Sequence, residues 1–183
     1  KPRLGNSALL TMAKSKGWLV DPKAGTGSAY NARDLNYSIP EVREWYASQM
    51  SHFLSDGVDF WWNDEGESSY FNFYHWNEAE QTMLAKFDKK KRFWTINRSY
   101  SPGMQRQGSL TWTGDVPVTW DALVATPGYV LNWELAGTAY ITCDTGGFNG
   151  GDVSALLLSR WFSVVTTIPS LNCANCASVG ARG

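Results

Sequence analysis

The sequence predicts an α/β fold, part of a (β/α)8 TIM barrel in which parallel strands alternate with helices. Strand and helix patterns alternate along the chain at fairly even intervals, which is typical of βαβ units. Polar residues follow the strands, and the first and last of them, Asp64 and Asp144, lie 80 residues apart over three steps. That spacing is near the roughly 31 residues per unit of an eight-unit barrel of about 250 residues.

A doubly wound sheet also places ligands at the carboxyl ends of parallel strands, so periodicity alone leaves that alternative open. The sequence has neither G-x-G-x-x-G nor G-x-x-x-x-G-K-[ST], the usual signals of nucleotide sites. Its 183 residues would build about five or six barrel units. We therefore expect residues 1–169 to form a partial catalytic barrel and residues 170–183 to form a divergent C-terminal tail.

The first half of the chain predicts two helices and two strands. Ser38 has capping-box spacing to Glu41, and apolar residues then recur with a 3.6-residue period to position 54, which predicts a helix. Alternating residues predict a strand over 58–62. A second helix is expected over 76–87, before a basic cluster suited to a helix C-terminus, and the next strand over 93–97.

The second half continues this alternation. A short strand is expected over 110–112, and the Thr126-Pro127 pair predicts an N-cap followed by proline at the first position of a helix that Gly137 ends. Residues 139–143 are nearly all apolar, as strands of parallel sheets are. Ser154 is expected to cap the last helix.

Composition excludes several classes of protein. The 16 Lys and Arg residues against 17 Asp and Glu give a net charge of −1, which argues against a nucleic-acid groove. A content of 43% hydrophobic and 14% aromatic residues argues against a disordered chain. No apolar run approaches the roughly 20 residues of a membrane-spanning helix.

The cysteines and clustered carboxylates are weak signals of a metal or redox site. Cys143 lies in an apolar run and is interpreted as a buried small hydrophobe. Cys173 and Cys176 form a lone C-x-x-C without the second Cys/His pair that a zinc site needs. The carboxylates of segment 64–67 leave open an alternative as metal ligands, although the carbonyl spacing of a calcium loop is absent.

Carboxylates near tryptophans suggest glycoside hydrolysis. Such a reaction needs one carboxylate at an oxocarbenium-like centre and a carboxylic acid that protonates the leaving oxygen. Asp64 follows Trp61 and Trp62, and Asp115 follows Trp112. Aromatic faces stack on pyranose rings, and burial near them raises a carboxyl pKa, which suits a general acid. The alternative is that both aspartates cap the loops after strands.

Four motifs in order resemble glycoside hydrolase family 31, the α-glucosidase family. Segment 57–67, GVDFWWNDEGE, resembles the family's nucleophile strand, G-V-D-G-x-W-x-D-M-N-E. Asn97-Arg98-Ser99 with Gln105-Arg106 resembles the family's R-S and R patterns. Trp112-Thr113-Gly114-Asp115 with Trp120 resembles its W-x-G-D and W patterns, and Asp144-Thr145-Gly146-Gly147-Phe148 resembles its D-I-G-G-F turn.

The resemblance implies a retaining (β/α)8 enzyme that acts on α-linked glucosides, or in some members α-xylosides, without a cofactor. It implies that Asp64 is the nucleophile and Asp115 the general acid/base. By the same resemblance, four further residues bind the sugar in the −1 subsite: Arg98, Asp144, Trp62 and Trp112. Hydrolase, transglycosylase and lyase variants of this chemistry stay open.

Three departures from the family pattern support a second hypothesis. Glu65-Gly66 replaces the usual Met-Asn, the N-terminal barrel strands are missing, and a His expected soon after Pro169 is missing. The second hypothesis is a non-catalytic, family-derived fragment that binds sugar weakly or associates with partners through incomplete barrel edges.

Overall fold

A computed structural model of the protein describes residues 4–21, 33–65 and 71–167. The chain divides into two compact units, Lys1–Ser109 and Leu110–Gly183. Within the described ranges, no helix combines the length and the apolar character required to cross a membrane. The expected tail over 170–183, with Cys173 and Cys176, lies outside the described residues.

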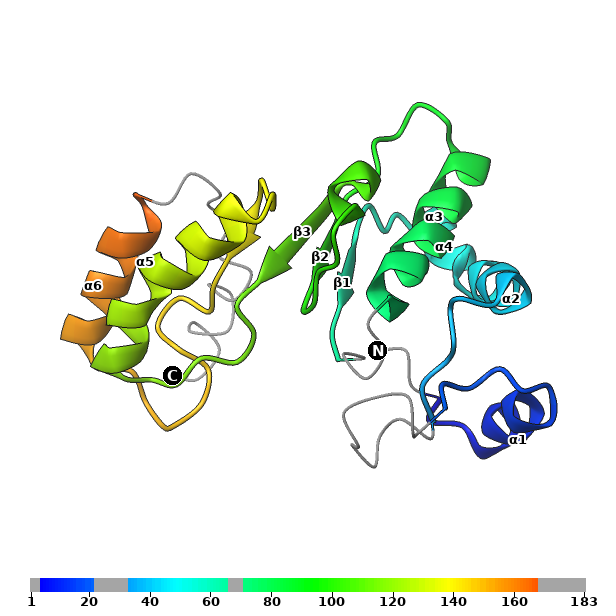
Figure 1. The fold of residues 1–183 in the computed structure, drawn as a ribbon, viewed down its shortest axis with the longest axis horizontal. Coiled ribbons are helices and arrows are strands. Elements are labelled where there is room, and N and C mark those ends of the chain that lie inside the picture. The colour runs from blue at the N-terminus through cyan, green and yellow to red at the C-terminus, as the bar shows by residue number, and fades with distance from the viewer. Residues whose placement is uncertain (1–3, 22–32, 66–70, 168–183) are drawn as a thin grey trace. The chain divides into compact units, whose positions relative to one another are not determined.

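The first unit alternates helices and strands (Figure 1). Strands β1 and β2 are parallel, with Trp61 beside Thr95 and Asn63 beside Asn97. The parallel pairing that the sequence predicted is therefore confirmed here. The elements are α1 (Ser7–Ser15), α2 (Pro40–Met50), α3 (His52–Ser55), β1 (Trp61–Asn63), α4 (Asn72–Phe87), β2 (Thr95–Asn97) and the 3-10 helix η2 (Met104–Gln107).

Helix α4 covers one face of β1 and β2, and α2 packs against α4 (Figure 1). An aromatic cluster joins the two helices: Tyr37, in the turn before α2, stacks on Trp76 of α4 at 5.5 Å between centroids, and Tyr46 of α2 meets Tyr37 edge-on at 5.2 Å. All three rings are buried, so this cluster holds α2 and α4 in a fixed relation. The opposite face of the strands carries Phe60 stacked on Trp94.

The start of α2 differs from the sequence prediction. Ser38 does not cap the helix, because its hydroxyl donates to Asn36 Oδ1 at 2.6 Å. The N-cap is Ile39, without a side-chain hydrogen bond, and Pro40 opens the helix with a φ that its ring already fixes. Local hydrogen bonding within the Asn36 turn therefore competes with the capping box and prevails.

Helix α1 was not predicted from the sequence. Its N-cap is Asn6, whose side chain accepts from the backbone N–H groups of Ala8 and Leu9. Asparagine is a strong N-cap residue, and the apolar residues that follow recur at helical spacing. These two signals together could have identified the helix.

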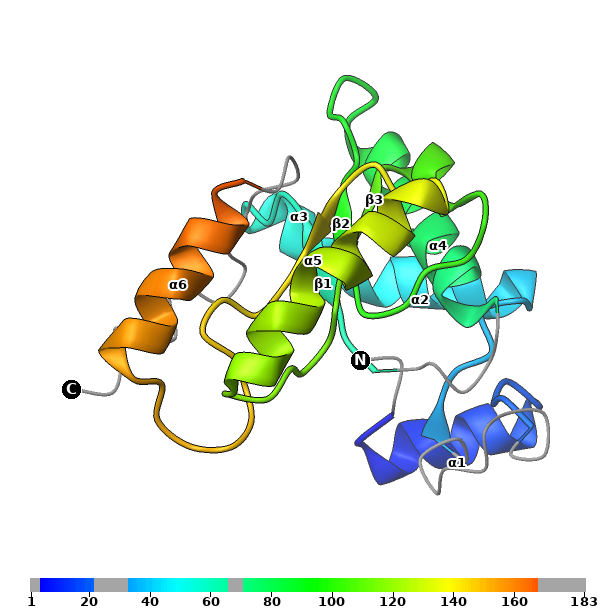
Figure 2. The ribbon, with the colours of Figure 1, turned by 60° about the vertical axis from the view of Figure 1, so that its left-hand side comes forward.

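The second unit contains β3 (Ser109–Trp112, beginning at the last residue of the first unit), α5 (Trp120–Leu135), β4 (Ile141–Thr142) and α6 (Ala155–Val165). Strands β3 and β4 are parallel, with Thr111 beside Ile141. Helix α5 packs against α6 and β4 (Figure 2). The core between them contains the fully buried Trp161 and the buried Cys143, as predicted for this cysteine.

The prediction that α5 begins at Thr126-Pro127 is wrong. The helix begins seven residues earlier, where the hydroxyl of Thr119 accepts from Ala122 N, and Pro127 lies inside it. The buried Thr126 is also helical, and its hydroxyl donates back to Ala122 O at 2.8 Å. The predicted end is confirmed, since Gly137 has φ 96° and its N–H donates to Glu134 O.

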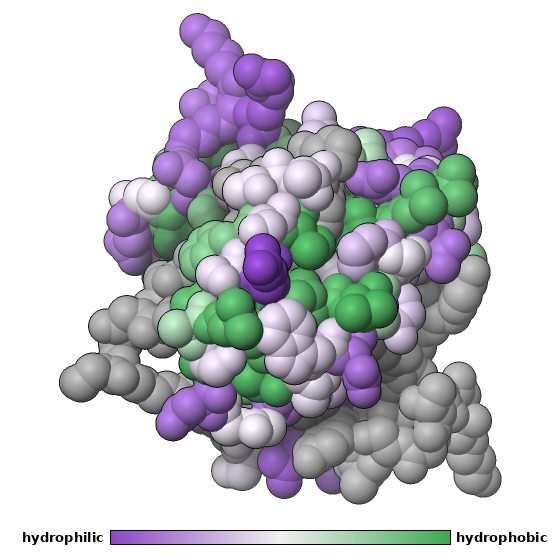
Figure 3. All heavy atoms as spheres, turned by 90° about the vertical axis from the view of Figure 1, so that its left-hand side faces the viewer, coloured by the Kyte–Doolittle hydropathy of each residue, from purple (hydrophilic) through white to green (hydrophobic). Residues whose placement is uncertain are grey.

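Helix α6 begins as predicted, with Ser154 Oγ accepting from Leu157 N at 3.2 Å. Helices α5 and α6 expose several large apolar side chains, and Figure 3 shows apolar side chains gathered on this side of the molecule. They are Val124, Leu131, Leu135, Leu156 and Phe162. Association through incomplete barrel edges stays a prediction.

Candidate active site

Asp64 and Arg98 come together at the carboxyl end of the β1–β2 pair. Asp64 directly follows β1 and Arg98 directly follows β2, and the last residues of the two strands are in register. Parallel strands in register deliver the next residues to the same edge, and Arg98 Nη1 lies 3.1 Å from Asp64 Oδ1. About a quarter of each side chain is exposed, 27% for Arg98 and 25% for Asp64, so the pair is within reach of a ligand.

Trp62 is the predicted aromatic residue closest to this pair in sequence. It lies two positions before Asp64, and side chains two apart in a strand share a face. Trp62 is 51% exposed, an unusual exposure for so large an apolar side chain. An exposed indole on the face that carries Asp64 and Arg98 offers a flat apolar surface for a sugar ring.

The remaining predicted residues lie in the second unit. Asp115 is exposed in the loop after β3. Trp112, the last residue of β3, is buried, with only 3% of its surface exposed. Asp144 is buried two residues after β4. In a retaining glycosidase the carboxyls of Asp64 and Asp115 are expected to lie roughly 5–6 Å apart, and this distance stays a prediction.

A tight turn fixes the backbone of Asp144. Its carbonyl accepts from Gly147 N at 2.9 Å, and Gly147 has φ 88°. A Cβ added at Gly147 would lie 2.7 Å from Val118 Cα, so the turn presses closely on the segment after β3. Glycine is therefore required at this position, both for its φ and for the space.

The backbone directly after Asp64 is also unusual. Glu65 has φ 55° and is the one non-glycine residue with positive φ in the described ranges. Glutamate rarely adopts this conformation, and such positions gather at functional sites. Glu65 also replaces the residue that the family resemblance led us to expect there.

Beneath the Asp64–Arg98 pair lies a buried polar network that sequence reasoning missed. Glu80 of α4 is completely buried, and its carboxylate accepts from Tyr46 Oη and Asn63 Nδ2, each at 2.9 Å. Asn77 of the same helix donates to Asn97 Oδ1 at 2.8 Å. Burial raises the pKa of Glu80 to about 7, while the hydrogen bonds from Asn63 and Tyr46 act to lower it.

Neither cysteine chemistry nor metal binding gains support from the described residues. Burial, and then the charge of Asp144, raises the pKa of the Cys143 thiol to about 12, which makes it a poor nucleophile. In residues 4–21, 33–65 and 71–167, no three His, Cys, Asp or Glu side chains gather closely enough to hold a metal ion. Glu67, one of the carboxylates weighed as a metal ligand, lies outside those ranges.

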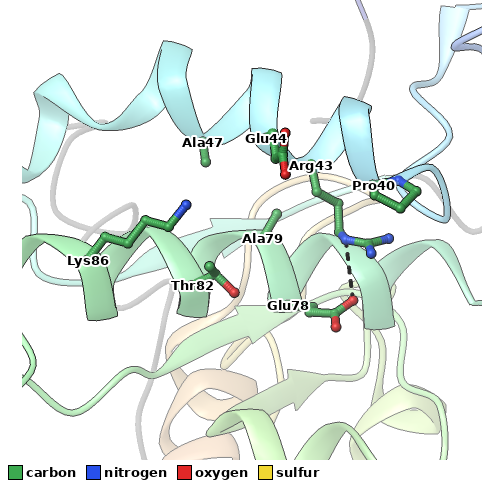
Figure 4. A pocket seen from close by; sticks show the side chains of 8 residues that line it. All are labelled: Pro40, Arg43, Glu44, Ala47, Glu78, Ala79, Thr82 and Lys86. Atoms are coloured by element: carbon green, nitrogen blue, oxygen red, sulfur yellow. Dashed lines mark ion pairs between the residues drawn. The ribbon is translucent and has the colours of Figure 1, made fainter.

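A hollow of about 220 Å³ lies between α2 and α4 (Figure 4). Its side chains are charged or small, and Arg43 Nε pairs with Glu78 Oε2 at 3.4 Å across it. None of the six predicted site residues lines this hollow. Arg43 also donates to the carbonyls of Tyr37 and Ser38, so its role is to hold the turn before α2.

Comparison with known proteins gives a consistent result. Residues 2–178 match the family model described as "Glycosyl hydrolases family 31 TIM-barrel domain". The chain is 28% identical to "Neutral alpha-glucosidase AB" of Dictyostelium discoideum over 82% of this chain and 19% of that protein. It is 30% identical to "Probable glucan 1,3-alpha-glucosidase" of Oryza sativa subsp. japonica over 71% of this chain and 17% of that protein.

Among solved structures, the fold is similar to a GH31 alpha-xylosidase from a soil metagenome, complexed with xylose. The TM-score is 0.76 at 24% identity, covering 90% of this chain and 29% of that one. Together with the family match, this confirms a partial barrel of parallel strands and alternating helices. The chain spans about a fifth of the length of the two curated relatives it matches.

Proposed function

The chain belongs to glycosyl hydrolase family 31, and from that premise we propose that it is part of the catalytic domain of a retaining α-glucosidase-like enzyme. The observation that carries this proposal is the Asp64–Arg98 pair at the carboxyl ends of β1 and β2. Catalytic groups of (β/α)8 enzymes gather at that edge. The proposed substrates are α-linked glucosides, in keeping with the names of the two curated relatives.

In the first proposed step, the Asp64 carboxylate attacks the anomeric carbon while Asp115, as a carboxylic acid, gives its proton to the leaving glycosidic oxygen. The glycosidic bond breaks and an ester forms between the sugar and Asp64. In the second step, Asp115 as carboxylate takes a proton from water, whose oxygen attacks the same carbon and releases Asp64. Two inversions at one carbon give net retention.

Arg98 and the remaining predicted residues would bind the sugar. The guanidinium offers several donors in a fixed plane, of which one faces Asp64 Oδ1, and donors of this kind suit sugar hydroxyls. The proposed partner of the sugar's apolar face is Trp62, which is exposed on the Asp64 face. Asp144 and Trp112 are proposed as further sugar-binding residues of the same subsite.

The stereochemistry of the product tests this function. Hydrolysis of p-nitrophenyl α-glucoside, followed by proton NMR, is expected to release α-glucose first, with the β-anomer appearing only by mutarotation. Release of β-glucose first would contradict the retaining mechanism. A protein that cleaves neither this substrate nor p-nitrophenyl α-xyloside would instead support the non-catalytic fragment.

Replacement of Arg98 by Ala is expected to weaken a glucose-configured iminosugar by roughly 1.5–3 kcal/mol, the range for a hydrogen bond to a charged group. Thermal stability is expected to change far less than binding, because the side chain is partly exposed. Isothermal titration calorimetry and a thermal melt measure the two effects.

The matched control is Arg92→Ala, because Arg92 is exposed and lies before β2 rather than after it. This control is expected to leave iminosugar binding unchanged. A large loss of stability in Arg98→Ala with unchanged affinity would make Arg98 a purely structural residue.

A further inference from the structure

We propose that Glu80, buried within α4, is a positioning residue that holds the Asp64–Arg98 pair through the side chains of Asn63 and Asn97. This inference rests on the proposed function, because the position of the pair affects catalysis only if Asp64 is the nucleophile. It also makes a statement about geometry that can be tested without any turnover.

The two asparagines occupy equivalent places in the strands. Asn63 is the last residue of β1 and Asn97 the last residue of β2, and they are in register. Each directly precedes one member of the pair, and successive side chains point to opposite faces of a strand. Fixing the asparagine side chains on the helix side therefore fixes where the next residues, Asp64 and Arg98, leave the strands.

A continuous set of hydrogen bonds joins α4 to both strand ends. Asn63 Nδ2 donates to Glu80 Oε2 at 2.9 Å and to Asn97 Oδ1 at 3.2 Å. The Asn97 oxygen also accepts from Asn77 Nδ2 at 2.8 Å, and Asn97 Nδ2 donates to Ser109 Oγ at 2.5 Å. The main chain adds a further tie, because Arg98 N donates to Asn63 O at 3.0 Å.

Glu80 is the one ionisable side chain in this set of hydrogen bonds between α4 and the strand ends, and it lies completely inside the protein. Its second oxygen accepts from Tyr46 Oη at 2.9 Å, so α2 also holds the carboxylate in place. An apolar side chain would fill this position at a lower desolvation cost, and a buried charge is weak support for stability. Its directional acceptors instead specify a single arrangement of the two strand ends.

Three variants test this role. Glu80→Leu removes the acceptors, whereas Glu80→Gln keeps one acceptor and the shape of the side chain. Glu44→Gln, at an exposed position on α2, is the control (Figure 4). Turnover of p-nitrophenyl α-glucoside is expected to fall on the order of 10²-fold in kcat for Glu80→Leu, with KM little changed, since a small misplacement of reacting groups costs about this much. Glu80→Gln is expected to recover most of the loss.

A second readout reports the geometry directly and needs no activity. In nitrogen-15 NMR, the guanidinium protons of Arg98 are expected to be resolved while the guanidinium is held against Asp64. They are expected to broaden or merge in Glu80→Leu and to stay resolved in Glu80→Gln and Glu44→Gln. If Glu80→Leu does not fold, Tyr46→Phe replaces it, because it removes one donor to Glu80 and keeps the ring, and a smaller change in the same direction is expected.

The outcomes separate the two proposals. A Glu80→Leu protein that melts at a lower temperature but keeps its kcat and its Arg98 signals would overturn the positioning role and leave the proposed function standing. A wild-type protein without activity would overturn the proposed function. In that case the Arg98 signals still decide whether Glu80 positions the pair.

Discussion

Asp64→Asn is expected to lower kcat/KM for p-nitrophenyl α-glucoside by roughly 10⁴-fold or more. The amide has no negative charge and attacks the anomeric carbon far more slowly, and loss of a catalytic nucleophile costs about this much in other enzymes. The fold is expected to survive, because Asp64 is partly exposed and its ion pair with Arg98 lies at the end of the strands. Steady-state kinetics and a thermal melt measure these two expectations.

The control for this change is Asp59→Asn. Asp59 lies five residues earlier, is largely exposed and pairs with Lys91 at 2.5 Å, at the opposite end of β1. Its replacement is expected to leave kcat/KM within about twofold, since exposed ion pairs contribute little. Equal activity in the wild type and in Asp64→Asn would remove Asp64 from the mechanism. Intact-mass analysis with a 5-fluoroglycosyl fluoride adds a second test, because only the wild type should form a covalent adduct.

The second large effect concerns the pH dependence of folding. Because burial raises the pKa of Glu80 from 4.5 to about 7, the folded protein binds this proton more tightly than the unfolded chain does. The contribution to stability is therefore fully present below pH 4.5 and is lost as the pH rises through about 7. The expected loss from this one group is about 3 kcal/mol, from the size of the shift.

Urea denaturation at pH 5, 6, 7 and 8 measures this loss, with Glu80→Gln and Glu44→Gln compared. Glu80→Gln is expected to flatten the dependence by removing the titrating group, whereas the exposed Glu44→Gln should keep the wild-type slope. The two tyrosines near Glu80 do not titrate in this range: burial, and then the charge of Glu80, raises the pKa of Tyr46 and of Tyr37 well above 10. An identical slope in the wild type and Glu80→Gln would show that Glu80 is not the origin of the pH dependence.

Local patterns predicted most of the elements because they depend on residues a few positions apart. Helices α2 and α4, the parallel β1 and β2 and the start of α6 all follow from apolar periodicity and capping residues. The two wrong predictions of helix starts also come from reading local patterns alone. At Ser38 and at Thr126-Pro127, a plausible local cap lost to another local hydrogen bond or to an earlier cap, and the sequence pattern does not rank such competitors.

The family motifs, and the place of Asp64 and Arg98 directly after two parallel strands, could be predicted from local residue patterns alone. The 3.1 Å contact between these two side chains, and the hydrogen bond from Asn63 to the buried Glu80, depend on the packing of the folded chain. Asn63 lies 17 residues from Glu80 and 34 from Asn97 along the chain, so no periodicity connects them. A buried carboxylate on a helix resembles any exposed glutamate in the sequence, because its burial and its partners come from the packing of α2, α4 and the strands.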